Sequence, residues 1–151
     1  MKSLINSIYD WFAEAYPKKT PKTLQVQMGV HFEEVAEMIS TLKGYDEDTQ
    51  ALLDAAYGAL DDLGTYLKKN TYVVCDVRIG EHTEFLDALC DQTVTAIGCA
   101  YHAGMDINSA LKQVDDSNYS KFVDGKAIFD ENGKIAKGPD YFKPVLKPFT
   151  R

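Results

Sequence analysis

The sequence predicts an all-α protein: a helical bundle of four to five helices with a small C-terminal hairpin or extended arm. Two observations lead to this fold class. Apolar residues recur at helical spacing through four long segments, and the connections between these segments are short. The chain has 151 residues, the length of one ordinary domain. We therefore expect a single domain over residues 1–151, in which residues 117–151 form the arm.

Start and stop signals place the helices along the chain. They are expected over residues 3–16, 21–42, 46–69, 81–102 and 106–116. Pro17 ends the first helix and Gly44 the second, while Thr20-Pro21 and Asp106 are typical helix starts. Residues 72–79 are rich in β-branched side chains, so this stretch is expected to be a short extended segment or a loop.

The last part of the chain has a different character. Lys126–Phe129 and Gly133–Ala136 flank Asp130–Gly133, a pattern that predicts a small hairpin with an Asn-Gly turn. Three prolines follow, Pro139, Pro144 and Pro148, and they favour an extended arm.

Charge and cysteine content restrict the function classes. The formal net charge is -7, which argues against duplex nucleic acid and anionic membranes as partners. Cys75, Cys90 and Cys99 include no CxxC pair, so we interpret them as reduced, mostly buried thiols. The N-terminal segment carries acids and does not look like a signal peptide, and no apolar run approaches a membrane span. We expect a cytoplasmic protein.

The first chemical motif lies in the second expected helix. Glu34 and Glu37 are three residues apart, so they project from one face, and Glu33 is four residues from Glu37. Like charges this close repel one another unless a cation lies between them. Exposed helices often carry such a pattern, so by itself it also fits a solvated acidic face.

The second motif, in the fourth expected helix, favours the metal interpretation. Asp87 and Asp91 lie four residues apart among neighbours that are apolar nearly all round, so this helix is expected to be largely buried. Buried carboxylates are costly unless compensated. Acid pairs on two core helices that face each other would form an all-oxygen site for Mg²⁺, with Mn²⁺ as a substitute. Glu84 could contribute, whereas Asp61-Asp62 and Asp115-Asp116 look like surface acids.

Together with later motifs, these acids resemble a known family, the MazG-like, all-α nucleoside triphosphate pyrophosphohydrolases. The nearest look-alikes are bacterial and phage proteins related to phosphoribosyl-ATP pyrophosphohydrolase, which implies a bacterial cytosol or a phage-encoded protein acting there. The resemblance covers nearly the whole chain. It is carried by Glu33-Glu34-x-x-Glu37, Asp87-x-x-x-Asp91, Ser117-Asn-Tyr-Ser-Lys121, Asp124-Gly-Lys126, Gly133-Lys134 and Lys137-Gly-Pro-Asp-Tyr-Phe142.

The resemblance implies a dimer or tetramer and Mg²⁺-dependent cleavage between the α and β phosphates, which gives a nucleoside monophosphate and pyrophosphate. By position, Glu34, Glu37 and Asp91 look like metal ligands. Glu33 looks like a ligand or the group that orients the attacking water, so Glu33 and Glu34 are the catalytic candidates. Many members have Glu-x-x-Asp where this chain has Asp87-x-x-x-Asp91. Asp87 is therefore a weaker candidate ligand.

Candidate substrate contacts come from polar side chains outside the acidic motifs. Lys121 and Lys137 could hold phosphate oxygens, with Asn118 as a polar partner, and Gln27 could meet the base or the sugar. Each could equally be a solvated surface residue. We expect residues 118–142 to fold over the triphosphate as a lid, and the competing hypothesis is a merely solubilising tail.

Two other functions stay open. One is a different hydrolase specificity, such as phosphoribosyl-ATP, dUTP or dCTP. The other is a catalytically inactive helical protein that binds a nucleotide or a partner helix. The apolar surface of the first helix and of the third helix's stripe predicts a homo-oligomer.

Overall fold

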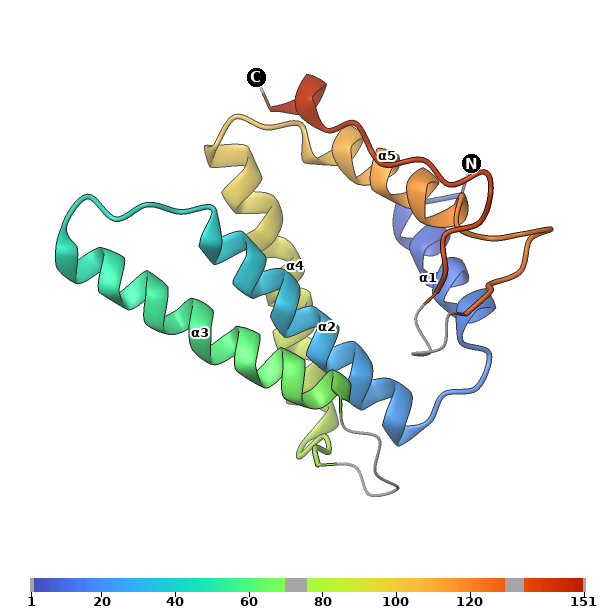
Figure 1. Ribbon diagram of the computed structural model, residues 1–151, viewed down its shortest axis with the longest axis horizontal. Coiled ribbons are helices and arrows are strands. Elements are labelled where there is room, and N and C mark those ends of the chain that lie inside the picture. The colour runs from blue at the N-terminus through green and yellow to red at the C-terminus, as the bar shows by residue number, and fades with distance from the viewer. Residues whose placement is uncertain (1, 70–75, 130–134, 151) are drawn as a thin grey trace. The chain divides into compact units, whose positions relative to one another are not determined.

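The computed structural model describes residues 2–69, 76–129 and 135–150. The all-α prediction is confirmed, and the described residues contain no β-strand. The helices are α1 (Leu4–Ala15), α2 (Pro21–Ser40), α3 (Glu47–Lys69), α4 (His82–His102) and α5 (Ile107–Tyr119), followed by a short 3₁₀ helix, η1 (Lys147–Phe149) (Figure 1). The second helix ends two residues before its expected boundary, and the fifth continues three residues past its own.

The chain divides into two compact units. Unit 1 comprises residues 1–17 and 81–151, and unit 2 comprises residues 18–80. Unit 1 therefore contains α1, α4 and α5, and unit 2 contains α2 and α3. The expectation of one domain stays a prediction.

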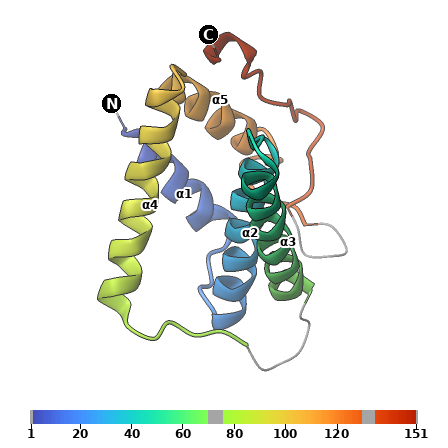
Figure 2. The same ribbon diagram turned by 90° about the vertical axis from the view of Figure 1, so that its left-hand side faces the viewer.

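Unit 2 is a helical hairpin in which α2 and α3 lie side by side (Figures 1 and 2). A capping box starts α2, because Thr23 N–H donates to Thr20 Oγ1 (3.1 Å) and Thr20 N–H donates to Thr23 Oγ1 (2.9 Å). Gly29 and Gly64 then allow the two backbones to touch. A Cβ atom on Gly29 would lie 2.8 Å from the Gly64 carbonyl oxygen, and one on Gly64 would lie 2.8 Å from that of Gly29.

Gln25 is the largest polar side chain in the buried part of unit 2, with 1% of its surface exposed. Its Nε2 donates to the Leu67 carbonyl oxygen at 3.3 Å, and its Oε1 accepts from the Asp76 N–H at 2.8 Å. These two bonds join α2 to the end of α3 and to the segment after it. A buried amide needs such partners, so Gln25 fixes how the hairpin ends.

The buried side of α2 differs from the apolar face read from the sequence. Its fully buried residues are Gln25, Gly29 and Ala36, whereas Met38 is half exposed. The expected face was built on the large side chains, but the close approach of α3 requires small ones.

In unit 1, aromatic rings join α1 to α5 and to the segment after it. Trp11 is buried and stacks on Phe122, with ring centroids 5.7 Å apart and planes 7° from parallel. Tyr119 packs edge-on against Phe122, and its hydroxyl donates to the Ser7 carbonyl oxygen at 2.8 Å. This cluster is the core of unit 1, and part of it comes from the C-terminal segment.

The C-terminal segment forms isolated β-bridges in place of strands. One pairs Val123 with Lys126, and the other pairs Phe129 with Ile135. The first closes a tight turn in which Asp124 (φ 50°) and Gly125 (φ 74°) both adopt the left-handed conformation, as in a type I′ turn. The Asn-Gly turn expected at residues 130–133 lies outside the described residues, although the Phe129–Ile135 bridge joins its flanks.

The prediction that the fourth helix is largely buried is wrong. None of the residues of α4 is buried in the chain. Leu86, Val94, Ile97 and Tyr101 expose between 50% and 76% of their surface. Apolar composition all round a helix indicates burial only when a partner covers each side, and within unit 1 the described residues leave every residue of α4 at least partly exposed. Among the described helices, none combines the length and the apolar character that crossing a membrane requires.

Candidate functional site

The acids of α2 follow directly from the contact between Gly29 and Gly64. Glu33 is one turn after Gly29, and Lys68 is one turn after Gly64. The helices run antiparallel, so these two positions lie on opposite sides of the glycine contact. Lys68 Cγ lies 2.9 Å from where a Cβ of Gly29 would be, so the Lys68 side chain passes across Gly29 and meets Glu33 in an ion pair. Lys68 is largely shielded, with 14% of its side chain exposed, and Glu33 exposes 34%. The expected role of Glu33 as a ligand or water-orienting group therefore competes with a bond to an ammonium group.

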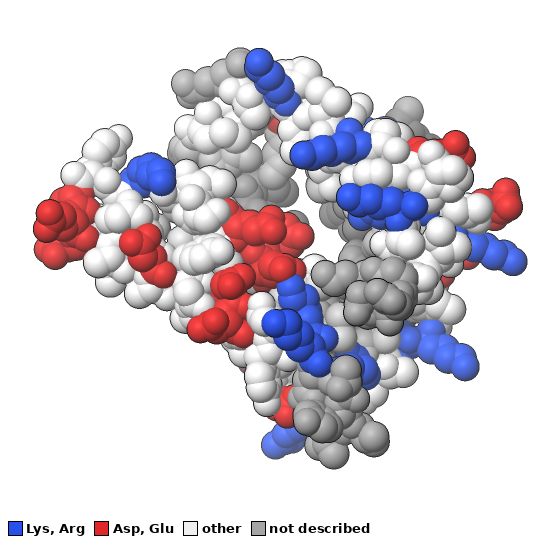
Figure 3. Space-filling model, viewed as in Figure 1, with Lys and Arg blue, Asp and Glu red and all other residues white. Residues whose placement is uncertain are grey.

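Glu34 and Glu37 differ from Glu33 because both are exposed. They lie on one continuous helix at a spacing of three residues, so both belong to the same acidic face of α2. Figure 3 shows acidic side chains gathered over the α2–α3 hairpin. The two carboxylates therefore lie at the surface of α2.

The acids of α4 are also exposed. Asp87, Asp91 and Glu84 all lie on the first half of this helix, and the structure places none of them in a core. The desolvation argument for a metal between Asp87 and Asp91 therefore does not hold, and the interpretation of these two residues as metal ligands rests on their spacing and on the motif.

Glu81 caps the helix by accepting from the N–H groups of Glu84 (2.7 Å) and Thr83 (3.0 Å). The Glu84 N–H contributes most to lowering the pKa of the Glu81 carboxyl, and that of Thr83 adds to the effect.

The donor chemistry fits a hard divalent cation, since carboxylate oxygens are its preferred ligands. Among the described residues, however, no group of three or more His, Cys, Asp or Glu side chains is arranged to hold a metal ion. Glu34 and Glu37 supply two carboxylates on α2, and Asp87 and Asp91 supply two on α4. A Mg²⁺ ion at either pair would complete its shell with water and substrate phosphate oxygens.

Three of the four expected substrate-binding residues come together in unit 1. Lys121 Nζ donates to Asn118 Oδ1 at 2.8 Å, and the Lys121 carbonyl oxygen accepts from the Gly138 N–H at 3.3 Å. The latter bond brings the backbone next to Lys137 to that of Lys121, whose ammonium lies 5.9 Å from the centre of the Trp11 ring. The Lys137 ammonium lies 4.8 Å from the centre of the Tyr141 ring. Lysine side chains are prominent over α5 and the segment after it in Figure 3.

The fourth residue, Gln27, is exposed on α2, away from the buried side of that helix. The sequence analysis did not identify Gln25 as a buried residue. Gln25 lies four residues before Gly29, so both are on one face of the helix, and this spacing could have indicated its burial. The sequence analysis also assigned Asp115 to the surface, and this was wrong. Asp115 exposes 4% of its surface on the inner side of α5, whereas Asp116 forms an exposed ion pair with Lys112 at 2.6 Å.

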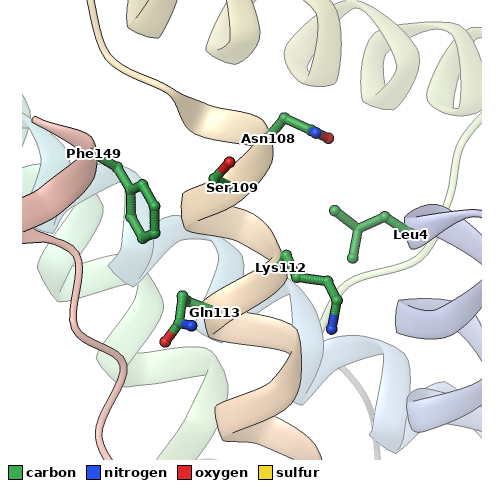
Figure 4. Close-up of a pocket in the computed structure, with 6 residues that line it drawn as sticks. All are labelled: Leu4, Asn108, Ser109, Lys112, Gln113 and Phe149. Atoms are coloured by element: carbon green, nitrogen blue, oxygen red, sulfur yellow. The ribbon is translucent and has the colours of Figure 1, made fainter.

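A hollow of about 470 Å³ lies along α5 in unit 1. Its lining residues are Leu4, Asn108, Ser109, Lys112, Gln113 and Phe149 (Figure 4). The amides of Asn108 and Gln113 point in different directions in that view, and Lys112 is already paired with Asp116. The start of α5 is capped by Asp106, whose Oδ1 accepts from the Ser109 N–H at 3.1 Å. The hollow therefore offers no set of polar groups aimed at one ligand.

Comparison of the chain with protein-family models, with curated proteins and with solved structures gives no significant match.

Proposed function

We propose that this chain is a metal-dependent hydrolase that converts a nucleoside or deoxynucleoside triphosphate to the monophosphate and pyrophosphate. The observation that carries the proposal is the exposure of four helical carboxylates in two spaced pairs: Glu34 with Glu37, and Asp87 with Asp91. Exposed acids on regular helices can receive a cation from solvent without unfolding a core. The ordered resemblance of the acidic and C-terminal motifs to pyrophosphohydrolases supports the same reaction.

The proposal gives each group a role. Glu34, Glu37, Asp87 and Asp91 hold Mg²⁺ or Mn²⁺, which when bound lowers the pKa of water and stabilises charge on phosphoryl oxygens. Glu34 or Glu33 orients the attacking water. The ammonium groups of Lys121 and Lys137 take up phosphate charge that the metal leaves, with Asn118 holding Lys121 in place.

The direct test is product analysis with a panel of nucleoside triphosphates and Mg²⁺. We expect pyrophosphate and monophosphate, and Glu37→Gln or Asp91→Asn to reduce turnover by about a hundredfold or more. Helix content should be unchanged in both variants, since both side chains are exposed. Release of orthophosphate and a diphosphate would show that the reaction is a different one. No turnover of any nucleotide would favour the inactive, partner-binding alternative.

Metal binding is tested separately by titrating Mn²⁺ into the substrate-free protein. If the acids of α2 and α4 serve a common site, Glu37→Gln and Asp91→Asn should each remove the same binding event. Loss of two different events would show two independent sites. Glu14→Gln, a change at an exposed acid on α1, is the matched control and should leave binding unaltered.

A further inference from the structure

Lys121, just after the end of α5, is restrained by its neighbours in unit 1. Its Nζ donates to Asn118 Oδ1 at 2.8 Å and lies 5.9 Å from the centre of the Trp11 ring. Its carbonyl oxygen accepts from the Gly138 N–H at 3.3 Å. A Cβ atom on Gly138 would lie 3.0 Å from the same oxygen, so a glycine allows the C-terminal segment to run this close. Both the backbone and the ammonium group of Lys121 are therefore held in place.

Trp11 is itself firmly packed beside this ammonium group. Its ring stacks on Phe122 with planes 7° from parallel, and Phe12 packs against it edge-on with ring centroids 5.0 Å apart. Only 8% of the surface of Trp11 is exposed, and its indole N–H has no hydrogen-bond partner among the described residues. Trp11 therefore acts through its ring, and the face of a tryptophan ring attracts an ammonium group more strongly than other aromatic rings do.

The partners of Lys121 restrain it without neutralising it. A lysine in solvent samples many rotamers, and it loses this freedom when its ammonium group binds a ligand. The Asn118 oxygen and the Trp11 ring remove part of that freedom in advance, and neither carries a net charge. Lys112 differs, because it forms an ion pair with Asp116 at 2.6 Å. Lys121 thus keeps its positive charge in a fixed place, as the binding of an oxyanion requires.

We propose that Trp11 is a positioning residue, which holds the Lys121 ammonium group in place for a phosphate group of the substrate. The inference deepens the proposed function and rests on it for the identity of the ligand. Lys121 contacts the phosphate, and Trp11 acts only through Lys121. An ammonium group has three N–H donors, and Asn118 accepts from one of them, so donors are left for phosphate oxygens.

Calorimetric titration of the whole chain with inorganic pyrophosphate, without metal, tests the proposal independently of catalysis. Lys121→Met should abolish the binding event. Trp11→Leu should weaken it by about two- to fivefold, and Trp11→Phe should restore most of the affinity, because it keeps an aromatic face and loses no hydrogen bond. Phe12→Leu is the matched control for packing. It removes a ring from the same cluster but leaves Trp11 beside Lys121, so it should bind pyrophosphate like the wild type.

The emission of Trp11, the single tryptophan, gives a second readout that needs no change at Trp11. Saturating pyrophosphate should change the emission of the wild type, because the ammonium group moves relative to the ring, but not that of Lys121→Met. A wild type that binds no pyrophosphate, a Trp11→Leu variant of unchanged affinity, or an equal loss in Phe12→Leu would overturn the proposal. Binding with the expected differences but without hydrolysis of any nucleotide would support it and end the proposed function alone.

Discussion

At the scale of single residues, backbone contact decides where the acids of α2 lie. Gly29 and Gly64 let the two helices approach until each carbonyl oxygen occupies the space of the other residue's missing Cβ. The Lys68 side chain then crosses the space left by the missing Cβ of Gly29 and reaches Glu33, one turn further along α2. The surroundings of Glu33, an expected site residue, thus depend on Gly29 and Gly64, which have no side chains.

Gly64→Ala should lower the free energy of unfolding by about 1–3 kcal/mol, because the new Cβ would lie 2.8 Å from the Gly29 carbonyl oxygen and force the helices apart. Urea unfolding followed by circular dichroism measures the change. Gly58→Ala in the same helix is the control, since a Cβ there meets nothing within 4 Å. It should stabilise the protein by up to about 1 kcal/mol through helix propensity. Equal effects at both positions would contradict the contact.

Lys68→Met should strengthen Mn²⁺ binding by about fivefold at most, because it removes a positive charge beside the acidic face of α2 and releases Glu33. Calorimetric titration of the substrate-free protein measures this. Lys69→Met, at the exposed next residue, is the control for a change in net charge alone. Unchanged affinity in Lys68→Met would show that Glu33 and Lys68 form a purely structural pair.

At the scale of elements, three helices begin at a carboxylate. Asp46, Glu81 and Asp106 cap α3, α4 and α5, with Thr49 N–H donating to Asp46 Oδ1 at 2.7 Å. The Thr49 N–H is the main cause that lowers the pKa of Asp46, as the Glu84 N–H is for Glu81 and the Ser109 side chain is for Asp106. All three caps are therefore favoured in their charged form in the folded state.

Stability should therefore fall in acid. Because folding lowers these pKa values, the caps contribute fully above the ordinary carboxyl pKa, and the contribution is lost as the pH falls through the lowered values. Asp106→Asn should keep the cap at neutral pH, since asparagine caps helices equally well, and should weaken the acid dependence. Urea midpoints at neutral pH and near pH 3 measure both effects. An acid dependence identical to that of the wild type would show that Asp106 does not contribute to it.

The lysine-bearing C-terminal segment is anchored to the end of α5. Ser117 Oγ donates to the Phe142 carbonyl oxygen at 2.8 Å, and the Phe142 N–H donates to Ser120 Oγ at 3.2 Å. Phe122 covers Trp11. Truncation after Ser117 would therefore remove part of the core together with any lid, so single substitutions are the better test of the lid.

Phe122→Ala should shift the emission of Trp11, the single tryptophan, to longer wavelength and lower the stability by about 3 kcal/mol or more, because it uncovers a buried ring. Lys137→Ala should leave both unchanged, since Lys137 is exposed. If Lys137 binds phosphate, its loss should raise KM for a triphosphate while Trp11 emission stays constant. A Lys137→Ala variant with altered emission would instead indicate a structural role.

The sequence predicted the helices well because each has its own local signals: apolar periodicity, Thr20-Pro21 at the start of α2 and Asp106 at the start of α5. The sequence analysis also proposed Asn118, Lys121 and Lys137 as substrate contacts. The structure pairs Asn118 with Lys121 and joins the backbone of Gly138 to Lys121, and the role of these residues in binding stays a prediction. The sequence analysis missed what depends on partners distant in sequence. Gln25 and Asp115 are buried by segments far along the chain, and the turn at Asp124-Gly125 was overlooked although Asp-Gly is a strong turn signal.

At the scale of the whole molecule, the acids of α2 belong to unit 2 and those of α4 to unit 1. No local pattern determines how two units combine, so the expectation that both acid pairs serve one metal site remains a prediction for the Mn²⁺ titration. The prediction that α4 is buried was wrong for a related reason. Hydrophobicity predicts that a surface will be covered, but it does not say whether the cover comes from the same chain.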